Sequence, residues 1–170
     1  MEKLDFNPVK SGNDFRENYK LHDLAEFAGK NLLTQWNISF ENFGDDRRND
    51  SVWEKGNDKP DLIISFNNKS ALLDWKGKHA PKWIVNSRAV KAYELWQMEK
   101  NLPVIICFFL FDDLSNLLDR RFAVLNSHKY KNQTKLQWDK NKTIEFVDDL
   151  PIFNKTNLIN FVFDRKEKDQ

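Results

Sequence analysis

Three ionisable side chains near the middle of the chain have types and spacing that suit hydrolytic chemistry: Asp61, Asp74 and Lys76. Twelve residues separate the two aspartates, and the lysine follows Asp74 by two positions. Carboxylate oxygens are the ligands that hard divalent cations such as Mg²⁺ prefer. A metal ion held there can polarise a water molecule, and a nearby ammonium can stabilise developing negative charge. The three residues therefore suit metal-assisted hydrolysis, provided that the fold brings them together.

A β-hairpin over residues 60–77, PDLIISFNNKSALLDWKG, would bring them together. Two short apolar segments, 61–66 and 71–76, have the length and composition of strands. The polar residues 67–70 between them are typical of a turn. A half-exposed hairpin with charged residues on its solvent side has the same pattern, so a purely structural hairpin stays open as an alternative.

A turn centred between Asn68 and Lys69 fixes the expected strand register. The opposed pairs are then Asp61 with Lys76, Ile63 with Asp74 and Ser65 with Leu72. Opposed residues share a face of the sheet, so one face of the hairpin is entirely apolar. Its residues are Leu62, Ile64, Phe66, Ala71, Leu73 and Trp75. The other face gathers the three charged residues at one end of the hairpin, and a slip of one residue would scatter both sets.

With this hairpin the chain resembles the PD-(D/E)XK nuclease superfamily, whose motif appears here as Pro60-Asp61 and, twelve residues later, Asp74-Trp75-Lys76. The resemblance implies an α/β fold with a restriction-endonuclease-like core, a mixed β-sheet flanked by helices in the order αβββαβ. It also implies a Mg²⁺-dependent endonuclease that hydrolyses phosphodiester bonds in DNA, with Mn²⁺ expected to substitute. Both a structure-selective enzyme, similar to Holliday-junction resolvases, and a sequence-specific enzyme stay open.

The resemblance also assigns roles to individual residues. Asp61 and Asp74 would bind the metal, together with the backbone carbonyl of Trp75. Lys76 would orient the attacking water or stabilise the phosphate. A glutamate on the first helix often reaches toward the metal in this family, and Glu26 matches by its place in AEFAGKNLL. A solvent-facing Glu26 is an equally good interpretation.

The flanking elements follow from hydrophobic periodicity. Apolar residues at helical spacing predict helices over 14–35 and 85–100. Alternation predicts a strand over 36–43, and the uniformly apolar segment 102–111 predicts a strand covered on both faces. Beyond it we expect a strand over 121–126, a second hairpin formed by 135–138 and 143–147, and a closing helix over 154–163.

Charge is nearly balanced over the whole chain, with 27 Lys and Arg against 26 Asp and Glu. This balance argues against binding nucleic acid through bulk charge. The segment 69–91, however, has six basic residues and one acidic residue, and it surrounds the expected site. We therefore expect Lys78, Lys82 and Arg88 to contact nucleic acid. Arg47 and Arg48, in the long connection 44–59, are further candidates, although an acidic connection without a role in binding is slightly favoured there.

A second basic cluster over 126–143 contains Tyr130 and Trp138 among its lysines. Such a mixture suits phosphate and base contacts, and a solvated edge hairpin explains it equally well. The 170 residues predict one nuclease domain over 1–170, with its core at about 14–111 and a C-terminal elaboration at 112–170.

Cys107 is the only cysteine, so no intrachain disulfide forms, and the three histidines lack the spacing of a zinc site. Without a signal peptide or a long apolar segment, we expect a soluble cytoplasmic protein. DNA is the expected partner, no membrane is involved, and cutting two strands favours a homodimer or a higher homo-oligomer. The alternatives are a catalytically silent nucleic-acid-binding or assembly subunit of the same fold, and a nuclease that acts on RNA.

Overall fold

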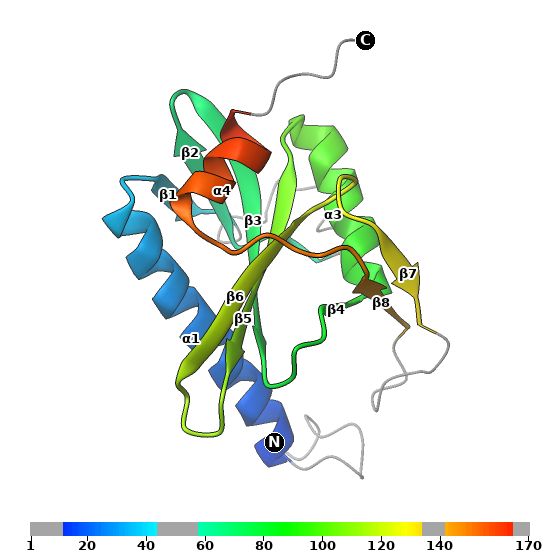
Figure 1. Ribbon diagram of the computed structural model, residues 1–170. Coiled ribbons are helices and arrows are strands. Elements are labelled where there is room, and N and C mark those ends of the chain that lie inside the picture. Colours follow the sequence, from blue (N-terminus) through cyan, green and yellow to red (C-terminus); the bar gives the residue numbers. More distant parts are fainter. Residues whose placement is uncertain (1–11, 44–57, 134–141, 165–170) are drawn as a thin grey trace.

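The structure is a computed structural model that describes residues 12–43, 58–133 and 142–164 (Figure 1). The main sheet has the strand order β1-β2-β3-β5-β6. Its strands are β1 (Ser39–Asn42), β2 (Leu62–Phe66), β3 (Lys69–Lys78), β5 (Val104–Phe111) and β6 (Leu117–Val124). A smaller sheet in the order β4-β8-β7 contains β4 (Ile84–Asn86), β7 (Tyr130–Asn132) and β8 (Thr143–Phe146). The helices are α1 (Gly12–Gln35), α3 (Ser87–Lys100), and α4 (Lys155–Leu158), which continues as the π-helical turn η2 (Ile159–Phe163).

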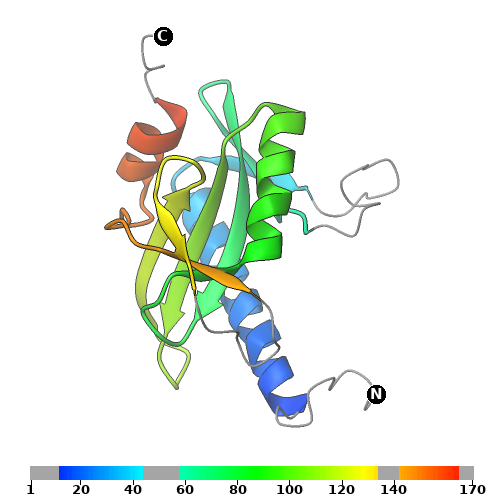
Figure 2. The ribbon, with the colours of Figure 1, turned by 90° about the vertical axis from the view of Figure 1, so that its right-hand side faces the viewer.

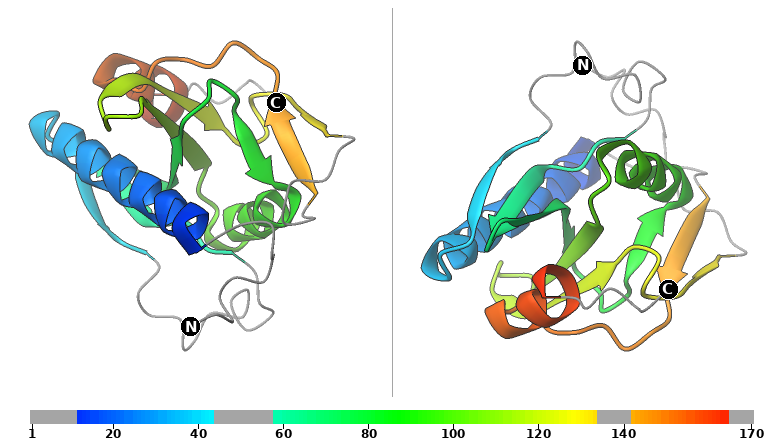
Figure 3. Two further views of the ribbon diagram at one scale, coloured as in Figure 1. Left: turned by 90° about the horizontal axis from the view of Figure 1, so that it is seen from below. Right: turned by 90° about the horizontal axis from the view of Figure 1, so that it is seen from above.

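The main sheet is mixed, as expected. β3 and β5 are parallel and are joined through α3, whereas the other neighbouring strands are antiparallel. Figure 3 shows α1 on one face of this sheet and α3 on the other. The predicted α/β fold with a mixed sheet flanked by helices is therefore confirmed. The short strand β4 precedes α3, so the helix predicted from residue 85 begins two residues later.

α1 packs on the sheet through the predicted apolar stripe. Leu21 and Ala25 are buried, as is Leu33, and the other members of the stripe lie partly buried against the same cluster. The helix ends where Asn37 adopts a positive φ of 57°. Because the backbone N–H of Trp36 still donates to the Leu32 carbonyl, the following strand begins at Ser39 and is shorter than predicted.

The hairpin of β2 and β3 forms with a register that differs from the predicted one. Asn67 and Asn68 both have positive φ, 50° and 65°, and form a two-residue turn. Ile63 therefore pairs with Leu72, and Ser65 with Ser70. Each residue has shifted by two positions along its partner strand, so the predicted faces survive but the predicted opposed pairs are wrong. Asn tolerates the left-handed conformation better than most residues, which favours the tighter turn.

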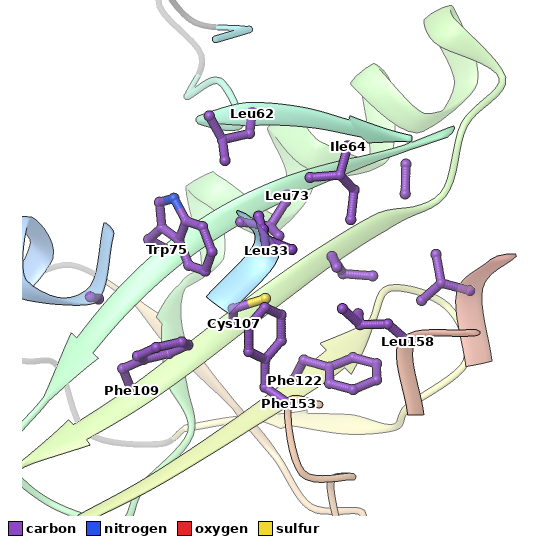
Figure 4. Close-up of a cluster of buried hydrophobic side chains, with 14 of the residues drawn as sticks. Leu33, Leu62, Ile64, Leu73, Trp75, Cys107, Phe109, Phe122, Phe153 and Leu158 are labelled. Atoms are coloured by element: carbon purple, nitrogen blue, oxygen red, sulfur yellow. The ribbon is translucent and has the colours of Figure 1, made fainter. Parts of the chain in front are cut away.

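The main sheet has a hydrophobic cluster on each face. The cluster on the α1 face contains the apolar side of the hairpin, and Figure 4 shows Trp75, Phe109 and Phe153 close together within it. The cluster on the α3 face includes Phe108 from β5 and Phe146 from β8. All eight residues of β5 are buried, which confirms a strand covered on both faces.

The C-terminal third completes both clusters. Phe153 and the α4–η2 segment close the α1 face, while β7 and β8 lie beside α3 on the other (Figure 2). The helical segment matches the predicted closing helix, and β6 begins four residues before the predicted strand. The predicted strand 135–138 lies outside the described residues, and the described strand β7 pairs with β8. In the described part of the chain, no helix has the length and apolar character needed to span a bilayer.

Candidate functional site

The two aspartates of the motif meet where the hairpin ladder ends. Asp61 immediately precedes β2, whose first residue pairs with Leu73, and Asp74 immediately follows Leu73. One carboxylate oxygen of Asp61, Oδ2, accepts a hydrogen bond of 2.9 Å from the backbone N–H of Trp75. The N–H and C=O groups of one residue point to the same side of a strand, so the Trp75 carbonyl is also directed to this edge. The shifted register therefore brings the carboxylates together.

Asp74 is almost completely buried, with 3% of its surface exposed. Burial raises the pKa of Asp74 to about 6; the ammonium of Lys76 acts to lower it, and the charge of Asp61 acts to raise it. The hydroxyl of Tyr93, on α3, also interacts with this carboxyl group and favours its ionised form. The Asp74 carboxyl group has the Lys76 ammonium as its cationic partner. A buried carboxylate is unfavourable unless a cation lies next to it.

Lys76 lies on the same face of β3 as Asp74, as predicted from their spacing of two residues. Its ammonium nitrogen is 2.9 Å from Asp74 Oδ2. Burial is the largest single influence and acts to lower the pKa of Lys76, but the charge of Asp74, the hydrogen bond to it and the charges of Asp61 and Asp58 together raise the pKa overall. Lys76 is therefore a cation at neutral pH, suited to stabilise negative charge rather than to accept a proton.

His22 of α1 is a further member of the site that the sequence reasoning missed. Its Nε2 atom lies 3.3 Å from Asp61 Oδ2. This contact is the main cause of the raised pKa of His22. Burial acts to raise the pKa of Asp61, but the contacts with His22 and the Trp75 N–H lower it overall. A chain separation of 39 residues hides this pair from local sequence patterns.

Glu26 lies one helical turn after His22 and is half-buried, with an ion pair of 3.6 Å to Lys30. It is close enough to His22 to raise the pKa of that imidazole. Glu26 therefore borders the site on the predicted helix, and His22 is the α1 residue in contact with Asp61.

Two glycines allow α1 to approach β3 closely enough for this contact. A Cβ atom on Gly29 would overlap the Trp75 ring, and one on Gly77 would overlap the backbone of Leu21. Each element thus lacks a side chain where the other crosses it. Leu21 and His22 are adjacent, so the close approach at Gly77 also places His22 beside Asp61.

The residues present fit a divalent cation. Asp61, Asp74 and the Trp75 carbonyl supply oxygen ligands, and Mg²⁺ is commonly held by one or two carboxylates with water and substrate oxygens completing its shell. The burial of Asp74 supports this fit, because a buried carboxylate is stabilised by adjacent cations. Within the described ranges, no group of three or more His, Cys, Asp or Glu side chains is arranged to hold a metal. A cation held by the two carboxylates and the carbonyl would share its coordination with water and substrate.

The predicted nucleic-acid contacts have different surroundings. The ammonium of Lys78 donates a hydrogen bond of 2.6 Å to the Ile84 carbonyl. Lys82 is exposed in the connection after β3, and Arg88 is 61% exposed and forms an ion pair of 3.2 Å with Asp58. Arg47 and Arg48 lie outside the described residues. Lys82 and Arg88 are thus exposed to a ligand, although Arg88 is paired with Asp58, whereas the ammonium of Lys78 is directed to a backbone carbonyl.

The sequence matches no protein-family model and no curated protein. Among solved structures, the chain is similar to the Holliday junction resolvase Hjc from the archaeal hyperthermophile Archaeoglobus fulgidus. The TM-score is 0.48 and the sequence identity 11%, with 73% of this chain and 83% of the resolvase covered. A similarity of this degree does not determine function, which has to be argued from the site itself.

Proposed function

We propose that this protein is a metal-dependent nuclease that hydrolyses phosphodiester bonds in DNA. The observation that carries the proposal is the grouping of Asp61, Asp74 and Lys76 at the open end of one hairpin. Asp74 is buried, and Lys76 is held beside it as a cation at 2.9 Å. Two carboxylates with an adjacent ammonium are the groups that metal-assisted phosphoryl transfer needs.

Each side chain has a distinct role in this proposal. Asp61 and Asp74 hold the cation together with the Trp75 carbonyl. The cation, when bound, polarises the attacking water and offsets charge on the leaving oxygen. Lys76 stabilises the negative charge that develops on the phosphate, and its raised pKa keeps it protonated for this purpose. The contact of His22 with Asp61 fixes the orientation of that carboxylate.

Cleavage assays on several DNAs test the proposal. Supercoiled plasmid, a four-way junction and single-stranded DNA would each be incubated with wild type, Lys76→Ala and Asp74→Ala in Mg²⁺, Mn²⁺ or EDTA. We expect cleavage by wild type in Mg²⁺ or Mn²⁺, none in EDTA, and a loss of at least about a hundredfold in either variant. Circular dichroism confirms that each variant is folded, and Lys69→Ala, at the far end of β3, is the matched control.

Three results would contradict the proposal or change it. Cleavage that persists in purified Asp74→Ala or Lys76→Ala would refute the assignment of the site. Binding of these DNAs without cleavage would favour the catalytically silent binding or assembly subunit. Preferential cleavage of RNA at matched salt would keep the site and change the substrate. The homo-oligomer expected for cutting two strands stays a prediction that sedimentation can test.

A further inference from the structure

Lys78 differs from the other basic residues near the site because its ammonium is directed into the protein. It lies on the same face of β3 as Asp74 and Lys76, two residues further along the strand. Its Nζ atom donates to the Ile84 carbonyl at 2.6 Å and lies 5.9 Å from the centre of the Phe108 ring. A lysine that contacts phosphate directly would instead present its ammonium to solvent.

The hydrogen bond from Lys78 closes the loop 79–83, which we name the basic loop. It joins the last residue of β3 to the first residue of β4, six positions apart. A second contact, 3.3 Å between His79 Nδ1 and the Phe111 carbonyl oxygen, holds the start of the loop. Its end is held by Trp83, whose carbonyl accepts a hydrogen bond of 3.0 Å from the Phe146 N–H. The loop is therefore fixed at both ends.

Between these fixed ends, the exposed residues of the basic loop are His79, Ala80, Pro81 and Lys82. Pro81 restricts the backbone, and the Lys82 N–H donates 2.7 Å to the Ala80 carbonyl in a tight turn. The ammonium of Lys82 is thus carried on a short, constrained segment that begins directly after the strand of Asp74 and Lys76. A constrained cation loses less conformational entropy when it binds a phosphate.

We propose that the basic loop is a phosphate-binding element for the DNA backbone next to the scissile bond, with Lys82 as the contact residue and Lys78 as a positioning residue that closes the loop. This inference rests on the proposed function, since it names the part of the surface that receives the substrate. It reassigns Lys78, which the sequence analysis expected to contact nucleic acid, to an internal role.

The electrostatics of Lys78 agree with this geometry. Burial lowers the pKa of Lys78 to about 8, and the positive charge of Lys76 adds to the effect. Burying the charged form of Lys78 is therefore unfavourable in the folded state. Replacing Lys78 by methionine keeps an unbranched side chain that can pack in the same place, so we do not expect Lys78→Met to unfold the protein. A role for Lys78 in binding can then be separated from a role in overall stability.

Binding of a labelled DNA duplex in Ca²⁺, followed by fluorescence anisotropy over a range of salt, tests the proposal without depending on cleavage. The variants are Lys78→Met, Lys82→Gln, the double variant, and Lys69→Gln as a control for loss of one exposed lysine from β3. We expect Lys82→Gln to weaken binding about tenfold at about 0.1 M salt and to lower the salt slope by about one. Lys78→Met should weaken binding to a similar extent, and the double variant no further.

Hydrogen exchange supplies the second readout. The backbone amides of residues 79, 80 and 82–84 should exchange faster in Lys78→Met and at the wild-type rate in Lys82→Gln, in the absence of DNA. Additive losses in the double variant, with a salt slope lowered by about two, would show that Lys78 itself contacts phosphate and would overturn its positioning role.

Wild-type affinity in Lys82→Gln, or a wild type that does not bind the duplex, would overturn the phosphate-binding role of the loop. Failure of the proposed function is recognised separately, as retained cleavage in the Asp74 and Lys76 variants. A duplex that binds through Lys82 and is never cut would support the loop and refute the nuclease.

Discussion

Asp74 is the residue in the site whose surroundings differ most from those of a surface aspartate. Burial in the α3-side cluster disfavours its charged form, while Lys76 and Tyr93 favour it. The balance leaves its pKa at about 6, so the carboxyl titrates close to neutral pH. In the protein without metal, part of the population therefore has a neutral Asp74. A divalent cation would compete with that proton, which couples metal binding to pH.

This pKa leads to a prediction about stability in the absence of metal. A carboxyl whose folded pKa is raised above its ordinary value of 3.8 contributes most stability below that value and loses it as pH rises through about 6. A difference of one in pKa between the folded and unfolded states corresponds to about 1.4 kcal/mol, so we expect Asp74 to lower the unfolding free energy by roughly 2–3 kcal/mol between about pH 4 and about pH 7. Thermal or urea unfolding in EDTA, repeated over this pH range, measures the decrease in unfolding free energy.

The matched variant is Asp74→Asn, which cannot titrate. Asp61, with a lowered pKa, and His22, with a raised pKa, also change protonation over part of this range. The difference in unfolding free energy between wild type and Asp74→Asn isolates the contribution of Asp74. A difference that stays constant with pH would show that Asp74 has an ordinary pKa and that its burial is not as described.

At the scale of elements, the approach of α1 to β3 decides whether His22 can reach Asp61. A glycine in a helix is normally unfavourable by about 1 kcal/mol relative to alanine. Gly29→Ala would therefore stabilise an isolated helix, but its Cβ overlaps the buried Trp75 ring. We expect Gly29→Ala to destabilise the protein by about 1–3 kcal/mol, the usual cost of overpacking. Asn31→Ala, at an exposed position of the same helix, should be neutral or slightly stabilising.

The same variant has a readout at the site. If the added methyl group displaces α1, the contact between His22 and Asp61 is lost, and the pKa of His22 should fall toward its ordinary value. NMR titration of the imidazole measures this change in Gly29→Ala and in the Asn31→Ala control. An unchanged pKa for His22, together with lower stability, would show that the ring of Trp75 yields while the helix stays in place.

The sequence was informative about the hairpin because the information there is local. Alternation with a period of two fixes which residues share a face, and the observed clusters agree with it. The predicted register rested on a turn centred between Asn68 and Lys69. The chain turns instead at Asn67 and Asn68, whose φ angles are positive. The shift of two positions places Asp61 opposite Asp74. The two carboxylates therefore lie closer together than the predicted register would have placed them.

Other parts of the fold depend on partners far along the chain. β4 has only three residues and exists because it pairs with β8, almost sixty residues later. His22 gains its role from Asp61, which no helical pattern can indicate. Likewise, the internal hydrogen bond of Lys78 requires β4 to return beside the end of β3. Composition and periodicity predicted a mixed sheet flanked by helices, and they placed Asp61, Asp74 and Lys76 on one face of the hairpin. Contacts between distant segments of the chain determine which other residues surround these three.

At the scale of the whole molecule, the C-terminal third belongs to the hydrophobic core. Phe153 is fully buried, and its ring lies 5.9 Å from that of Trp75, 5.4 Å from that of Phe109 and 5.3 Å from that of Trp36. The backbone of Phe153 and of the two residues before it also pairs with the edge strand β6. Trp75 is adjacent to Asp74, so the packing of this distant segment supports the strand that holds the site.

We therefore expect Phe153→Ala to destabilise the protein by about 3–5 kcal/mol, the usual cost of removing a buried phenylalanine. Phe27→Ala, which removes the same group from a position 70% exposed on α1, is the control and should change stability by less than about 0.5 kcal/mol. Denaturant unfolding of both variants provides the comparison. Equal stabilities would mean that residues 14–111 form a core independent of the C-terminal third. A selective loss in Phe153→Ala would show that the core around the strand bearing Asp74 and Lys76 depends on packing against the C-terminal third.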